Sequence, residues 1–358
     1  MTEAVHIPTE NATRDLWRLL NRFSYPTNIS RYLQDKGLQY SQALVQFVAG
    51  SFSQSEAYFS AAGSSPLDIS PLLLYYGAVS LLAGAAALTK GEKLPIDGHG
   101  MALIAPGTGR IASAQVVPRG NGALQQFTDV FSPGCAFANS VPWTLLEILG
   151  SVPDLAQDFL DCYEDGDPYT LAIEVVKTDQ GWVERLAKKE FTRFGTPDDA
   201  LTRIESLAES YLAPQITNEY VVLRRKLNSP DIGIYSLFNQ KHLQLAHVMN
   251  GRTTTPGQIP VMLMGMFSLG FMSRYHPGLW NPFVRHDETG ELLLIEKFVA
   301  VCHRYFPNLV LNEVSGSRMH FVSNTAQTLG PSGPVPRGKP QAGTTRLTCR
   351  GVDGGGIL

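Results

Sequence analysis

Residues 71–89 read PLLLYYGAVSLLAGAAALT, an uncharged stretch nearly as long as a bilayer-spanning helix, which needs about 20 apolar residues. The stretch contains paired tyrosines, a serine and a dense run of Gly and Ala. It lacks the flanking Lys/Arg asymmetry and the interfacial aromatic residues that anchor a membrane span. A helix that is apolar on every side is otherwise typical of a protein core. We therefore predict a buried central helix here, with a membrane span as the alternative.

Further helices are predicted on both sides of this stretch. Apolar residues recur at helical spacing over 13–23 and 41–62 before it, and over 258–273 and 291–305 after it. Between them, short strands and turn pairs are indicated over 99–131, and a β-hairpin is indicated by 170–177 and 183–189 around an Asp-Gln-Gly turn. Another helix is expected over 197–212, and residues 220–248 are ambiguous between strand and helix. The fold class is therefore mainly α with a β insertion (α+β).

The same patterns predict how the chain is divided. We expect one domain over 11–322, with a helical part over 11–91, a mixed α/β part over 97–250 and a second helical part over 256–306. Residues 323–358 are rich in Gly, Pro and small polar residues, which cannot bury enough surface to offset the entropy of ordering them. They are predicted to form a disordered tail.

The composition excludes several classes of protein. The net charge is -3, from 29 basic and 32 acidic residues, so no broad surface for a polyanion is expected, although a local patch remains possible. The four cysteines lie far apart without a CxxC pair, which argues against a disulfide framework or a zinc site. The first residues have no basic start followed by an apolar run, as an export signal would. We expect a cytoplasmic protein with no metal and no cofactor.

Familiar catalytic motifs are missing from the sequence. Residues 333–340, GPVPRGKP, nearly match a phosphate-binding loop, but their prolines remove backbone donors and a proline stands where Ser or Thr is required. No HExxH, GxSxG or protein-kinase loop occurs. The sequence therefore favours a protein that is not an enzyme, although it does not exclude one.

The most suggestive stretch is SRYHPGLW at residues 273–280, directly after an apolar helix. It brings a guanidinium, an imidazole and two amphipathic rings together at a helix exit, where a pocket for an anion or a base would fit. The structural alternative is that the cations cap the helix while the rings fill the core. The candidate ligand-binding residues are Arg274, Tyr275, His276, Trp280 and Arg285.

A second candidate is His99, which lies between two glycines in DGHG at residues 97–100. Histidine titrates near neutral pH and can act as a general acid or base, but a histidine between glycines can equally be a turn residue. His99, Arg274 and His276 are the weak candidates for a catalytic role.

Three segments together resemble the YaaC-like protein family: PLLLYYG at 71–77, DGHG at 97–100 and SRYHPGLW at 273–280. The resemblance spans about residues 17–321 and implies a cytosolic bacterial or archaeal protein of poorly defined function, without supplying a mechanism. The helix with Tyr75 and Tyr76, followed by a turn and His99, is also loosely similar to HEPN domains, which occur in RNA-cleaving toxins. Catalytic HEPN proteins have an arginine followed, after four to six residues, by a histidine, and no arginine in this chain has a histidine at that spacing.

Two hypotheses follow from the sequence. The first is a non-catalytic regulatory protein that binds a protein partner or a small anionic ligand such as a nucleotide. The alternative is a divergent HEPN-like RNA-cleaving or toxin/defence-type protein. Under either hypothesis, RNA binding and oligomerisation are possible, and no association with a membrane is expected.

Overall fold

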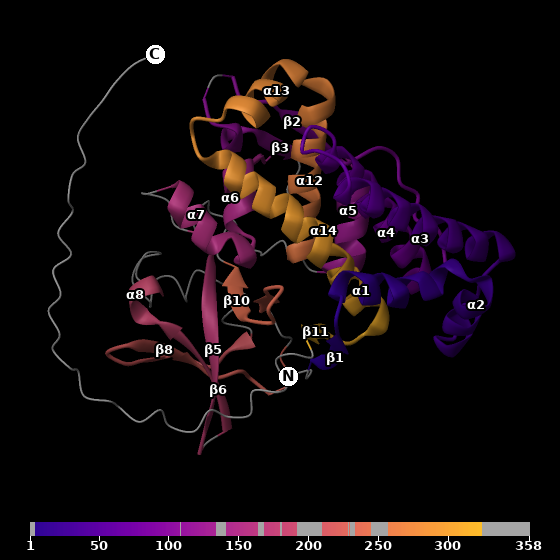
Figure 1. Cartoon of the computed structure of the whole chain (residues 1–358). Coiled ribbons are helices and arrows are strands. Elements are labelled where there is room, and N and C mark those ends of the chain that lie inside the picture. Colours follow the sequence, from indigo (N-terminus) through magenta and orange to yellow (C-terminus); the bar gives the residue numbers. More distant parts are fainter. Residues whose placement is uncertain are drawn as a thin grey trace, which may run out of the picture.

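Helix α4 (Ser70–Lys90) lies at the centre of a helical body. It packs against α3 (Gln42–Gly63), α12 (Gln258–Tyr275) and α14 (Glu291–Ser315), and Figure 1 shows these four helices side by side. Among the residues that the structure describes, α4 is the one helix long and apolar enough to cross a bilayer, and 61% of its most apolar window is buried inside the protein. This burial supports the prediction of a central core helix.

The structure is a computed structural model, and it describes residues 4–107, 109–133, 141–163, 168–179, 181–191, 210–227, 229, 233–244 and 257–323. The predicted tail therefore lies outside the described residues from 324 onwards, as does most of the helix expected over 197–212. The division into parts at 11–91, 97–250 and 256–306 stays a prediction.

Glycines determine how closely the central helices approach one another. A Cβ atom on Gly84 of α4 would lie 2.9 Å from the Cβ of Ser51, and one on Gly77 would lie 2.8 Å from the ring of Phe59, both on α3. On another side of α4, a Cβ on Gly270 of α12 would lie 3.1 Å from the Cα of Leu72. Such distances leave no room for side chains at these positions, so glycine allows the helices to pack this closely.

The other elements follow in chain order. The N-terminal part contains β1 (Val5–Thr9), α1 (Ala12–Leu20), the 3₁₀ helix η1 (Asn21–Ser24) and α2 (Pro26–Asp35). The middle part contains β2 (Met101–Ile104), η2 (Ile111–Ser113), β3 (Gln115–Pro118), α5 (Ala123–Phe131), β4 (Trp143–Thr144), α6 (Leu145–Gly150), η3 (Pro153–Leu155) and α7 (Ala156–Cys162). It continues with β5 (Thr170–Thr178), β6 (Gly181–Ala187), α8 (Lys188–Phe191), β7 (Gln215–Ile216), β8 (Tyr220–Leu223), β9 (Ile234–Tyr235) and β10 (Lys241–Gln244). Helix α13 (Pro277–His286) and β11 (Met319–Ser323) complete the described chain.

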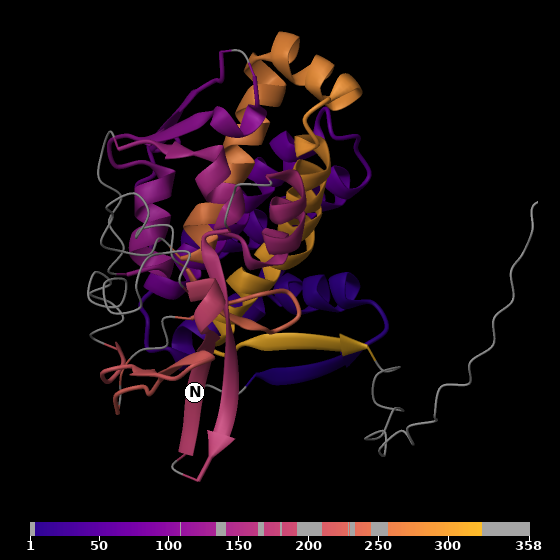
Figure 2. The ribbon, with the colours of Figure 1, turned by 90° about the vertical axis from the view of Figure 1, so that its left-hand side faces the viewer.

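The strands form separate small sheets. A three-stranded sheet has the order β2-β3-β4, and a six-stranded sheet has the order β7-β8-β6-β5-β10-β9, with antiparallel pairs throughout. The third sheet joins the two ends of the described chain, because β1 pairs in parallel with β11. Figure 2 shows these two strands side by side.

The six-stranded sheet has a buried ion pair near its centre. The ammonium of Lys241 on β10 donates a 2.7 Å hydrogen bond to Glu184 on β6, and Tyr211 donates to the other oxygen of that carboxylate. Both charged side chains are almost completely buried. Removal of either charge would leave the other one buried without its partner, which is strongly destabilising. We therefore assign this pair a structural role.

The predicted fold class is confirmed, with local corrections. The hairpin and the central helices occur as predicted, whereas the end of the region expected to be strands, 99–131, forms helix α5. The ambiguous residues 220–248 contain the strands β8, β9 and β10. Helix α14 continues past Pro307 to Ser315, ten residues beyond the predicted end, because the apolar residues after the proline are buried and their burial offsets its lost hydrogen bond.

We expect Gly84→Ala to destabilise the protein by about 1–3 kcal/mol, because its new methyl group would overlap with α3. Gly50→Ala is the matched control, since Gly50 is an exposed residue of α3 with no atom near its absent Cβ. The control should stabilise the protein by about 0.5–1 kcal/mol through helix propensity alone. Urea denaturation measures both, and equal stabilisation by the two changes would contradict close packing at Gly84.

A second prediction concerns acid stability. Burial lowers the pKa of His242 on β10 to about 4, from an ordinary value of 6.5. The unfolded chain therefore binds a proton more readily than the folded one between these values, so the stability should fall as the pH falls through this window, by up to roughly 3 kcal/mol. Denaturation at pH 7, 5.5 and 4 measures this loss, which should be smaller in His242→Leu. An identical loss in the variant would contradict the assignment.

Candidate functional site

Tyr75 and Tyr76 lie in the second turn of α4, where the helix meets the end of α12 and the loop that follows α4. Tyr75 is buried, and its hydroxyl oxygen lies 2.7 Å from Nδ1 of His99. Burial raises the pKa of Tyr75 far above its ordinary value, so the phenol keeps its proton. Because a protonated phenol both donates and accepts, the tautomer of His99 determines which of the two groups donates in this hydrogen bond.

Arg274 reaches the neighbouring tyrosine from the last turn of α12. Its Nη1 donates a 2.6 Å hydrogen bond to the hydroxyl of Tyr76, and its guanidinium carbon lies 4.9 Å from the ring centre of Tyr275. The ring of Tyr58 on α3 stacks on Tyr76 with the centres 6.0 Å apart. In the described part of the chain, no carboxylate forms an ion pair with Arg274. Among the described residues, the guanidinium is therefore held in place by a hydrogen bond and not by an ion pair.

His99 lies within the electrostatic reach of this arginine. The pKa of His99 is lowered, first by burial and second by the positive charge of Arg274. The imidazole also contacts the ring of Phe267 on α12, with the ring centres 5.5 Å apart. The structure thus brings together two residues that are separated in the sequence by about half of the chain. We call the group of Tyr58, Tyr75, Tyr76, His99 and Arg274 the tyrosine cluster.

The other predicted ligand-binding residues lie between the end of α12 and the last turn of α13, and they differ in exposure. His276 joins α12 to α13, and its ring centre lies 5.9 Å from that of Phe271. Tyr275 is 55% exposed, and Arg285 is exposed in the last turn of α13. Trp280 is completely buried against Phe283, so a ligand on the surface would not contact its indole ring. Whether these residues bind a ligand stays a prediction.

Sequence reasoning assigned no role to the tyrosines of the cluster, although the pair at 75–76 was visible in the sequence. Two adjacent tyrosines inside an otherwise aliphatic helix are a signal, because each buried phenol needs a hydrogen-bond partner. The identity of those partners depends on how α12 and the loop after α4 pack, which the local sequence does not specify.

The described residues give little support for a metal site or for a cysteine nucleophile. No three His, Cys, Asp or Glu side chains gather there in an arrangement that would hold a metal ion. The pKa values of Cys162 and Cys302 are both raised by burial, so their thiols are protonated at neutral pH and are weak nucleophiles. Cys135 and Cys349 lie outside the described residues.

Comparisons with known proteins give one match. A family model described as YaaC-like Protein matches residues 22–314. No curated protein and no solved structure matches the chain. The matched segment contains every residue of the tyrosine cluster, whereas the resemblance to HEPN domains stays a prediction.

The juxtaposition of His99 and Arg274 can be tested by titration. Because the charge of Arg274 lowers the pKa of His99, Arg274→Gln should raise that pKa towards its ordinary value, while burial keeps it from reaching that value. NMR titration of the histidine rings measures the change, with His99→Gln used to assign the signal. Arg285→Gln is the control and should leave the pKa of His99 unchanged. Equal effects of the two arginine substitutions would show that Arg274 does not act on His99.

Proposed function

Because the chain belongs to the YaaC-like protein family, and its matched segment contains the whole tyrosine cluster, we propose that this cluster binds a small anionic ligand such as a nucleotide. The protein would then be a non-catalytic binding or regulatory protein. The observation that carries the proposal is the position of Arg274, whose charge has no carboxylate partner among the described residues and is held by a hydrogen bond to Tyr76.

The donors left on Arg274 suit a phosphate or carboxylate. A guanidinium has five N–H donors in a planar fork, and one hydrogen bond to Tyr76 leaves others for a ligand. Charge-assisted bonds of this kind are roughly twice as strong as neutral ones. Nε2 of His99 is the ring nitrogen that Tyr75 does not contact, and it would be a further polar group for the ligand.

Aromatic rings beside Arg274 would allow the site to bind a ligand that is larger than a single anion. Tyr275 is more than half exposed and lies next to the guanidinium, and Tyr58 stacks on Tyr76 one helix away. Flat aromatic side chains bind the faces of bases, because stacking requires only a ring on each side. A ligand with both a phosphate and a base would use the arginine and a ring together.

The ionisation of the cluster favours binding over catalysis. Tyr75 stays protonated because burial raises its pKa, and its hydroxyl shares one hydrogen bond with Nδ1 of His99, so the two groups satisfy each other. A general base needs a free lone pair directed at the substrate, whereas Arg274 offers donors and a fixed positive charge. We also propose a cytoplasmic protein, and the enclosure of the apolar helix α4 by other helices supports this to the extent that it argues against a membrane span.

The test is a thermal-shift screen of the full chain against nucleotides and phosphorylated metabolites. A ligand present at 100 times its Kd should stabilise the folded state by about 2.7 kcal/mol. Binding should be lost in Arg274→Ala and retained in Arg285→Ala, which removes the same charge from α13. Binding that survives Arg274→Ala, or no shift with any small anion, would overturn the proposal, and the second result would favour a protein partner.

The same samples test the absence of catalysis. Single-stranded RNA incubated with the protein should remain intact under this proposal. Cleavage that disappears in His99→Gln or His276→Gln would replace the proposal with the RNA-cleaving alternative.

A further inference from the structure

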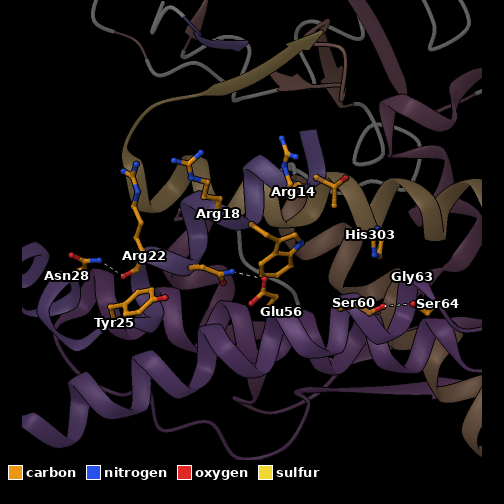
Figure 3. Close-up of a pocket in the computed structure, with 13 residues that line it drawn as sticks. Arg14, Arg18, Arg22, Tyr25, Asn28, Glu56, Ser60, Gly63, Ser64 and His303 are labelled. Atoms are coloured by element: carbon orange, nitrogen blue, oxygen red, sulfur yellow. Dashed lines mark hydrogen bonds between the residues drawn. The ribbon is translucent and has the colours of Figure 1, made fainter. Parts of the chain in front are cut away.

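A separate groove of about 730 Å³ lies between the N-terminal helices and α3. One side is formed by α1 and η1, the other by the second half of α3, and His303 of α14 contributes to its lining. Figure 3 shows this groove with its lining side chains. It shares no residue with the tyrosine cluster.

Three arginines form a row along the groove. Arg14, Arg18 and Arg22 follow one another at intervals of four residues, and η1 continues directly from α1, so all three lie on one side. Figure 3 shows their guanidinium groups side by side along one edge. Four residues of α-helix rise by about 6 Å, so the row is roughly 12 Å long.

Little negative charge opposes this row. Arg14 has an ion pair with Asp15 at 3.5 Å, but its side chain is 67% exposed, and such a pair is weak. No described carboxylate forms an ion pair with Arg18 or Arg22. The groove contains one carboxylate, that of Glu56, which accepts a 2.6 Å hydrogen bond from Asn21. The groove therefore has a net positive charge, although the chain as a whole is slightly acidic.

Polar and aromatic groups complete the lining. Ser60 of α3, and Ser64 directly after that helix, offer hydroxyls on the edge opposite the arginines. Tyr25 lines the groove beyond Arg22 and is 64% exposed, so the face of its ring is accessible. The side chain of Asn28 donates to the backbone carbonyl of Arg22, which orders the chain at this end of the row.

We propose that this groove binds a short segment of single-stranded RNA, with successive phosphates along the three arginines and a base stacked on Tyr25. A positively charged groove with an accessible aromatic ring is the usual means of holding a single strand. The serine hydroxyls and the carboxylate of Glu56 are partners for the 2′-hydroxyl, which both donates and accepts hydrogen bonds and distinguishes RNA from DNA.

The length of the row favours a strand over a free nucleotide. The phosphates of a di- or triphosphate are joined through a single oxygen and lie much closer together than arginines about 6 Å apart. Successive phosphates of an extended strand are separated by a whole sugar, and this spacing is comparable to that of the arginines. Contact with three phosphates predicts a slope of about -2 when the logarithm of affinity is plotted against the logarithm of salt concentration.

Fluorescence anisotropy with a labelled oligouridine and the full chain tests this proposal. We expect binding with the salt slope given above, and a preference over DNA of the same length. Arg18→Gln should weaken binding and reduce the slope by about 0.7, as expected for one lost phosphate contact to a single strand. Arg31→Gln is the matched control, because Arg31 is an exposed arginine of α2 that does not line the groove, and it should bind like the wild type. Tyr25→Ala should weaken binding roughly tenfold.

Three results would overturn the proposal. Equal affinities of Arg18→Gln and Arg31→Gln would show that the row does not bind the strand. Equal or tighter binding of DNA would remove the assignment to RNA, and displacement of the oligonucleotide by ATP at a concentration equal to that of the RNA would indicate a free nucleotide. Arg274→Ala separates this groove from the tyrosine cluster, since that variant should bind RNA normally. All substituted residues are exposed, and unchanged melting temperatures would confirm that the variants are folded.

Discussion

The close approach of α3 and α12 to α4 is the constraint on which the tyrosine cluster depends. Helix α4 is apolar on nearly every side, so it is stable only if other helices cover it, and Gly77 and Gly84 let α3 do so at short range. Gly270 does the same for α12 at the first turn of α4. Arg274 follows Gly270 by about one helical turn, so the contact that packs the core also places the guanidinium against Tyr76. The geometry of the tyrosine cluster is in this sense a consequence of helix packing.

Helix α3 carries residues of both sites on different sides. Tyr58 stacks on Tyr76, whereas Ser60, together with Ser64 directly after the helix, lines the groove that contains the three arginines. Gly63 allows His303 of α14 to approach the end of α3 closely, much as Gly77 allows α3 to approach α4. A Cβ on Gly63 would lie 2.8 Å from Nε2 of His303. That nitrogen donates to the carbonyl of Phe59 and so fixes α14 against the end of α3. Functional groups mounted on packed helices keep their relative positions better than groups on loops, which favours preformed sites in both places.

The sequence predicted features that depend on neighbouring residues, such as a helix, but not contacts that depend on a distant part of the chain. The length and the uncharged character of residues 71–89 predicted the central helix, and Gly91 marked its end by adopting a left-handed conformation. The pairing of β1 with β11 joins residues more than 300 positions apart, and neither short segment indicates its partner. His99 and Arg274 were chosen for their residue types, but their link through two tyrosines required the packed helices. The spacing of Arg14, Arg18 and Arg22 was visible, yet the overall charge of -3 gave no reason to examine one helix face.

The two sites differ in how they relate to the family match. The match begins at residue 22, so it contains the whole tyrosine cluster but only one arginine of the groove. The other two lie on α1, whose position depends on the first strand: β1 pairs with β11, the hydroxyl of Thr9 bonds to Asp15, and Asn11 caps the helix. These contacts hold α1 over α3 and thereby form one side of the groove. The residues of the proposed ligand site therefore all lie within the matched segment, whereas the proposed RNA groove also uses α1, which precedes it.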